Sequence, residues 1–147
     1  MRFNGKDFAV GDPIYIYSPL YIEELDLSSV SKYIYVLEFG KLVDDVLAPK
    51  MKKLIIGGEK SAKALNTLSG LNTMVNLEYL DLTGIDYPNI DISKLLMLKT
   101  LILTDSTINT LSIPEGCMIE DLYINKSLKS ITLNGVQNLL LDNIHGF

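Results

Sequence analysis

The chain has 147 residues, of which 48% are hydrophobic and 21% charged, and its net charge is −5 at pH 7. This length predicts one domain over residues 1–147, and the acidic balance argues against binding to nucleic acid, whose phosphates attract basic surfaces. No apolar run reaches the roughly 18 residues of a membrane-spanning helix, so no membrane partner is expected. With one cysteine and no apolar segment of the secretory type at its start, we expect a cytoplasmic protein without a disulfide framework.

Seven short strands are expected from an apolar-x-apolar pattern that recurs at a nearly regular interval. In chain order they lie around Ile14–Ile16, Ile34–Val36, Leu54–Ile56, Leu80–Leu82, Leu101–Leu103, Leu122–Ile124 and Leu139–Leu141. The clearest members belong to three segments spaced 21 residues apart, Leu77-x-x-Leu80-x-Leu82, Leu98-x-x-Leu101-x-Leu103 and Ile119-x-x-Leu122-x-Ile124. Residues 1–13, which precede the first strand, are expected to cap that end.

The segments between these strands are of two kinds. Lys41–Leu47 and Ser61–Gly70 have apolar residues at helical spacing and each predicts a helix, the second capped by Ser61 and ended at Gly70. A second apolar series, in phase with the strands, predicts extended segments at Ile90-x-Ile92, Leu111-x-Ile113 and Ile131-x-Leu133. Two series in phase are typical of a solenoid in which every turn packs a front strand against a back segment.

These segments resemble the leucine-rich repeat family, whose pattern is L-x-x-L-x-L-x-x-N-x-L. Asn76–Gly84 is similar to one such repeat, and Leu111–Gly116 and Ser127–Leu133 are similar to the irregular repeats of bacterial and phage proteins. The turn asparagine of the family has no constant counterpart, because the residues after the strands are Thr83, Thr104, Asn125 and Asp142. The resemblance implies a β-rich α/β solenoid: a right-handed coil with a parallel front sheet of about seven strands and mixed helical and extended back segments. It also implies a protein-recognition scaffold without chemistry of its own.

The residues between the inward-facing Leu and Ile positions should face solvent, because successive side chains of a strand point to opposite sides. Tyrosine and isoleucine are frequent at these outward positions, and tyrosine supplies contact area at low entropic cost. A partner-binding surface on the front sheet is therefore predicted, made of Tyr15, Tyr33, Tyr35, Tyr79, Asp81, Ile102, Asp121 and Tyr123. The alternative is that these residue types are present because strands favour them.

No catalytic, metal or cofactor site is predicted. His145 is the only histidine, so the usual nitrogen and sulfur ligands of a metal cannot be assembled around it. Cys117 is expected to be a small turn or core residue. The segment Gly57-Gly58-Glu59-Lys60-Ser61 differs from a phosphate-binding loop, because Glu59 stands where that loop needs a glycine.

We therefore expect a non-enzymatic module that binds a protein partner. The alternative within binding is a free-standing inhibitor, of the toxin-immunity or phage counter-defence type, that occludes a functional site of its partner. Carbohydrate or nucleotide binding is the remote alternative, and a subunit of a larger assembly is a further one.

The C-terminal end of the expected solenoid leaves two possibilities open. Either Ile144 and Phe147 cover the last turn, or its edge is open. Because an uncovered strand edge pairs readily with another chain, an open edge predicts a homodimer.

Overall fold

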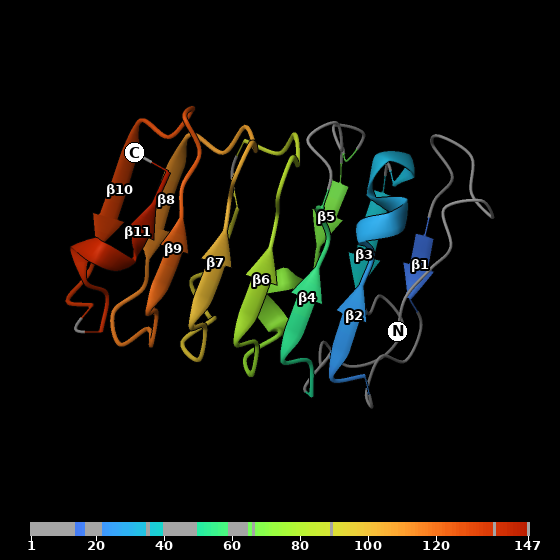
Figure 1. The fold of residues 1–147 in the computed structure, drawn as a ribbon. Coiled ribbons are helices and arrows are strands. Elements are labelled where there is room, and N and C mark those ends of the chain that lie inside the picture. Colours follow the sequence, from blue (N-terminus) through green and yellow to red (C-terminus); the bar gives the residue numbers. More distant parts are fainter. Residues whose placement is uncertain are drawn as a thin grey trace.

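The computed structural model describes residues 14–16, 22–34, 36–39, 50–58, 65, 67–88, 90–136 and 138–146. Short parallel strands form three sheets in this part of the chain (Figure 1). The largest sheet has six strands, in the spatial order β11 (Ile144–His145), β9 (Asp121–Tyr123), β7 (Thr100–Ile102), β6 (Tyr79–Asp81), β4 (Lys53–Ile55) and β2 (Glu24–Asp26). We call it the front sheet. The expected β-rich architecture with parallel strands is confirmed.

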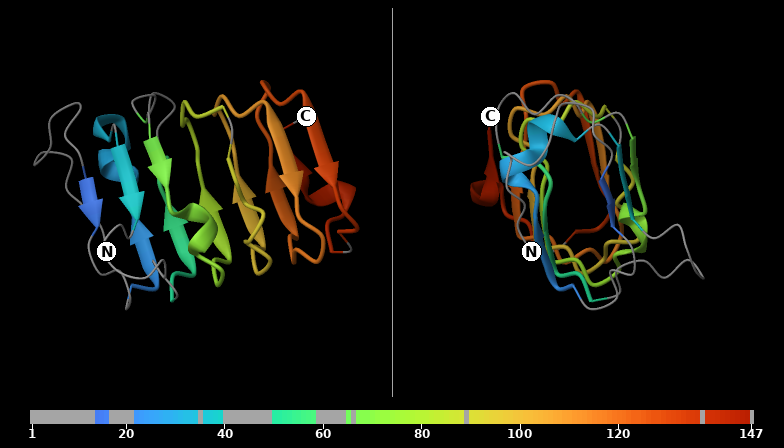
Figure 2. Two further views of the ribbon diagram at one scale, coloured as in Figure 1. Left: turned by 180° about the vertical axis from the view of Figure 1, so that it is seen from behind. Right: turned by 90° about the vertical axis from the view of Figure 1, so that its right-hand side faces the viewer.

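Two smaller sheets lie behind the front sheet, and their strands point the other way (Figure 2). One contains β1 (Ile14–Ile16), β3 (Val36–Phe39) and β5 (Thr67–Ser69), and the other contains β8 (Thr110–Ile113) and β10 (Ser130–Leu133). Three short 3-10 helices complete the described elements, η3 (Ser28–Tyr33), η4 (Leu71–Thr73) and η5 (Leu141–Asn143). The end-on view in Figure 2 shows the chain surrounding a narrow interior.

The 21-residue period becomes the register of the front sheet. Leu80 aligns with Leu101 and Leu101 with Leu122, so equivalent positions of successive segments lie side by side. Leu54 extends the same row on the other side of Leu80. Since the side-chain period of a strand is two residues, this register places every one of these leucines on the same face of the sheet.

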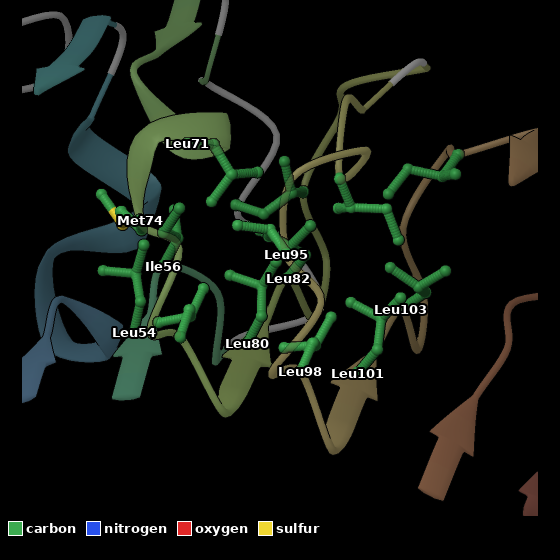
Figure 3. Close-up of a cluster of buried hydrophobic side chains, with 14 of the residues drawn as sticks. Leu54, Ile56, Leu71, Met74, Leu80, Leu82, Leu95, Leu98, Leu101 and Leu103 are labelled. Atoms are coloured by element: carbon green, nitrogen blue, oxygen red, sulfur yellow. The ribbon is translucent and has the colours of Figure 1, made fainter. Parts of the chain in front are cut away.

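The row of leucines forms one side of the core. Leu54, Leu80 and Leu101 are fully buried, and Figure 3 shows them projecting from successive strands into a cluster that also contains Leu71 and Leu95. Complete burial of a leucine side chain stabilises the fold by roughly 1.5–3 kcal/mol. Cys117 is buried as well, which confirms the prediction of a core residue.

Two of the strands expected in the front sheet belong to a different sheet. β1 coincides with the expected strand 14–16, whereas β3 begins at residue 36, where the expected strand 34–36 ends; the two strands pair with each other and not with β4. The strand beside β4 is β2, in which Leu25 aligns with Leu54. An apolar-x-apolar pattern fits either sheet, because both sheets turn alternate residues toward the same core.

The helix expected at Ser61–Gly70 is wrong over its described part. Thr67–Ser69 form β5, which pairs in parallel with β3, and Gly70 has a φ of 85° before η4 begins. Strand pairing here overrides the helical spacing of the leucines, as tertiary contacts often do. The expected helix at 41–47 and the expected cap at 1–13 lie outside the described residues.

The last strand of the front sheet also differs from the expectation. The expected strand Leu139–Leu141 is replaced by η5, and the front strand follows it as β11, where Ile144 aligns with Leu122. The extended segments expected at Leu111–Ile113 and Ile131–Leu133 are confirmed as β8 and β10. No strand is assigned at residues 90–92.

Candidate partner-binding face

The outward-pointing residues of the front sheet lie in two rows that cross its strands. Because neighbouring strands are in register, the members of each row are adjacent from strand to strand. The first row is Glu24, Lys53, Tyr79, Thr100 and Asp121. The second row is Asp26, Ile55, Asp81, Ile102, Tyr123 and His145. We call these two rows the front face.

Five of the eight predicted binding residues meet on this face: Tyr79, Asp81, Ile102, Asp121 and Tyr123. Tyr15 is on β1, so its expected place in the front sheet is wrong. Tyr33 belongs to η3, outside the strands of this sheet, which corrects its expected place as well. Tyr35 lies outside the described residues. The aromatic surface is therefore smaller than predicted.

His145 packs against the predicted surface, although it is not among the predicted binding residues. Its ring stacks on Tyr123, with centroids 4.3 Å apart and planes at 24°, and its Nε2 lies 4.0 Å from Oδ1 of Asp121. The sequence signal for this strand is Ile144, which repeats the inward position of Leu122 after 22 residues, close to the 21-residue period. The apolar-x-apolar match at residues 139–141 was predicted as the last front strand in place of β11.

Tyr79 occupies the middle of the face. The Nζ atom of Lys53 lies 4.8 Å from the centre of its ring, within the range of a cation–π contact. Partial burial, the negative charge of Asp81 and the nearby Tyr123 raise the pKa of the Tyr79 hydroxyl. The phenol therefore stays protonated at neutral pH and can donate a hydrogen bond to a partner.

Asp81 shapes the turn that follows its strand. Its Oδ1 accepts a hydrogen bond from the backbone N–H of Thr83 at 2.8 Å and another from the Thr83 hydroxyl at 2.6 Å. Asp26 repeats the backbone bond on β2, accepting from the N–H of Ser28 at 2.9 Å. Such local bonds hold the chain in a turn, so Asp81 has a structural role beside the predicted binding role.

A third row, of alternating charge, borders the front face where the strands begin. Backbone hydrogen bonds of 2.7–2.8 Å connect its successive members, Glu23, Lys52, Glu78, Lys99 and Glu120. The Nζ of Lys99 lies 3.3 Å from Oε2 of Glu78. Exposed pairs of this kind contribute little stability individually, but opposite charges on adjacent strands favour this register over a shifted one.

The front face and its border are acidic as a whole. The three rows contain seven carboxylates and three lysines, a net charge of −4 with His145 neutral, against −5 for the whole chain. The half-buried Tyr79, Ile102 and Tyr123 lie within this acidic frame.

A hollow of about 370 Å³ opens on another part of the surface, beside β5 and η4. Its lining is apolar at Leu68, Leu71 and Ile90, and polar where Asp91 accepts a hydrogen bond from the side-chain amide of Asn72 at 3.3 Å. Hydrogen bonds from Ser93 lower the pKa of Asp91, so the hollow carries a negative charge at neutral pH. It is separate from the front face.

The comparisons with known proteins return nothing: no family model, curated protein or solved structure matches the chain. Within the described residues, no three histidine, cysteine or acidic side chains are grouped so as to hold a metal ion. That same part of the chain includes no helix long and apolar enough to cross a membrane.

Proposed function

We propose that this chain is a non-enzymatic protein-interaction module that binds a basic surface of a partner protein through its front face. The observation that carries the proposal is the adjacency of Tyr79, Ile102 and Tyr123 inside an acidic frame. We further propose that the fold is a right-handed solenoid of the leucine-rich-repeat type. Its support is the register, which aligns Leu80, Leu101 and Leu122 at the interval of the sequence repeat.

The dimensions of the front face suit a protein partner. Six strands about 4.8 Å apart span roughly 24 Å, on the scale of an interface that buries about 800 Å² on each side. Tyrosine is enriched among the residues that dominate binding energy, and such residues cluster centrally with a polar rim around them. Tyr79 is on β6, one of the two middle strands, Tyr123 is on β9, two strands away, and the charged row supplies a rim.

The charge of the face selects the partner. A net charge of −4 over three adjacent rows attracts a basic surface and repels an acidic one. Complementary charge of this kind raises the association rate, and salt screens it. We therefore expect association with the partner to slow as ionic strength rises.

A second candidate function rests on the same charge. An acidic face can cover a basic functional site of its partner, such as one that binds nucleic acid or phosphate, and the chain would then be a free-standing inhibitor. The two functions differ in one measurement, because only an inhibitor abolishes the activity of the captured protein at stoichiometric concentration.

Carbohydrate or nucleotide binding remains the remote alternative, and the hollow beside β5 is its place in the structure. The negative charge of Asp91 would repel a phosphate group in this hollow, which disfavours nucleotides. A thermal shift with sugars and nucleotides tests it, since a ligand at 100 times its Kd stabilises the protein by about 2.7 kcal/mol.

The decisive experiment isolates partners by affinity capture and then measures each Kd with purified components. Tyr79→Ala and Tyr123→Ala should each weaken binding about 30-fold, equivalent to about 2 kcal/mol. Tyr87→Ala is the matched control, because this tyrosine lines the hollow and not the front face. A partner that binds both front-face variants as tightly as the wild type would rule out this surface.

A further inference from the structure

We propose that the end of the molecule formed by β10, η5 and β11 is a contact surface for a second copy of this chain. These elements lie at one end of the row of strands, beside the C-terminus (Figure 1). Among the described strands, β10 pairs only with β8 and β11 only with β9. Each is thus the outer strand of its sheet, and an outer strand presents backbone N–H and C=O groups to a further strand.

The core of the molecule is uncovered at this end. Ile131 and Leu133 align with Leu111 and Ile113, two residues that are 4% and 0% exposed. In β10 the same inward positions are 38% and 46% exposed. The difference arises because β8 is covered by β10, whereas β10 has no strand beyond it in the described part of the chain.

The segment between β10 and β11 enlarges this apolar surface. Leu140 is 62% exposed and Leu141 81% exposed, the two largest values among the exposed large apolar residues that the structure describes. With Ile131 and Leu133, this end of the molecule therefore carries four exposed large aliphatic side chains. Exposed apolar surface of this kind is characteristic of an interaction site.

The charge at this end favours a copy of the same chain as the occupant. Across β10, η5 and β11, Asp142 is the single residue among aspartate, glutamate, lysine and arginine, whereas the front face and its border carry a net charge of −4. The front face attracts a basic partner, whereas the end surface offers such a partner one carboxylate. Two copies of this weakly charged end, in contrast, meet with little like-charge repulsion.

A two-fold rotation is the arrangement that satisfies these features. It apposes the same surface on both copies, and outer strands related by it run antiparallel, so that each can extend the sheet of the other. The contact is confined to the end of two layers about 10 Å apart, which is smaller than a standard interface of about 800 Å² per partner. We therefore expect a dimer with a micromolar Kd.

Sedimentation equilibrium between about 1 and 100 µM tests the proposal. The wild type should pass from monomer to dimer, and Leu140→Asp and Leu141→Asp should raise the dimer Kd at least tenfold. Both substitutions are at exposed positions, so folding should be retained. Val75→Asp and Leu96→Asp are matched controls, because these residues are 48% and 44% exposed elsewhere on the molecule and should leave the dimer unchanged.

Three outcomes would overturn the proposal: a monomer throughout the range, a dimer that only the control variants disrupt, or a mass that grows beyond two copies. A measurement on the wild type alone is independent of variant folding, since backbone amide exchange in β10 should slow as the protein concentration rises. Tyr79→Ala, on a strand away from this end, should weaken partner binding but leave the dimer intact, so failure of the front-face proposal and failure of this one are distinguishable.

Discussion

At the scale of single residues, Tyr79 is the side chain whose chemistry the structure changes most clearly on the front face. Burial opposes the charged phenolate, and the negative charge of Asp81 opposes it further. The ammonium group of Lys53 lies over the ring of the same tyrosine. Its proposed role as a contact residue therefore rests on a neutral hydroxyl and an aromatic surface.

We expect the proton of Tyr79 to be held more tightly in the folded chain than in the unfolded chain, where the tyrosine pKa is about 10. The resulting stabilisation is fully present below about pH 10 and is lost as the pH rises through the folded-state pKa. In urea unfolding between pH 8 and 11, Tyr79→Phe should lose less stability with rising pH than the wild type. Equal losses in the two proteins would contradict this prediction.

At the scale of elements, Gly57 and Gly58 permit the turn after β4 to lie close to the turns that follow β2 and β6. A Cβ atom on Gly57 would overlap the carbonyl oxygen of Thr83, and one on Gly58 would lie 2.6 Å from Cβ of Ser28. The N–H groups of both glycines donate to carbonyl oxygens of the next turn, at Asp81 and Thr83. These N–H groups are thus engaged within the protein, which supports the sequence-based exclusion of a phosphate loop.

Gly57→Ala should destabilise the fold by at least 1–3 kcal/mol, the typical cost of forcing an extra carbon into a packed site. Gly116→Ala is the control: its φ of 77° strains an alanine by about 1–2 kcal/mol, but its surroundings are open. Urea unfolding of both variants measures the difference. A smaller loss of stability in Gly57→Ala than in Gly116→Ala would show that the turns can separate.

At the scale of the whole molecule, stability comes from a thin core shared by successive strands. Leu54, Leu80 and Leu101 each lie between equivalent residues of two neighbouring strands, because the register aligns them. These neighbours bury the leucines in the middle of the row, whereas the inward residues of the last back strand, β10, remain exposed. Substitutions should therefore have their largest effects in the middle of the row.

Leu101→Ala should lower the free energy of unfolding by about 2–5 kcal/mol, since it removes a fully buried side chain and leaves a cavity. Leu140→Ala should change it by about 0.5 kcal/mol or less at a concentration where the chain is monomeric. Denaturation in urea at low micromolar concentration provides the comparison. Similar losses in the two variants would mean that the core is not centred on the leucine row.

The candidate face could be predicted only in part. Strand alternation placed Tyr79, Asp81, Ile102, Asp121 and Tyr123 correctly on one sheet, because they lie in the segments with the strictest period. Tyr15 was misplaced because the apolar-x-apolar pattern at residues 14–16 fits either sheet, and His145 was overlooked because residues 139–141 were predicted as the last front strand. The protein-binding role of all these residues remains a prediction.

The sequence by itself determined the parallel register of the central strands and the row of buried leucines, because a repeat of 21 residues aligns equivalent apolar positions wherever successive segments pair. Only the tertiary structure decided which sheet each outer strand joins, since the period-two pattern of β1 or β3 fits either layer equally well. It also decided that Thr67–Ser69 form a strand, because pairing with β3 outweighs a local preference for helix. Local patterns specify which side of a segment is apolar, and the choice of neighbour depends on contacts between residues far apart in the chain.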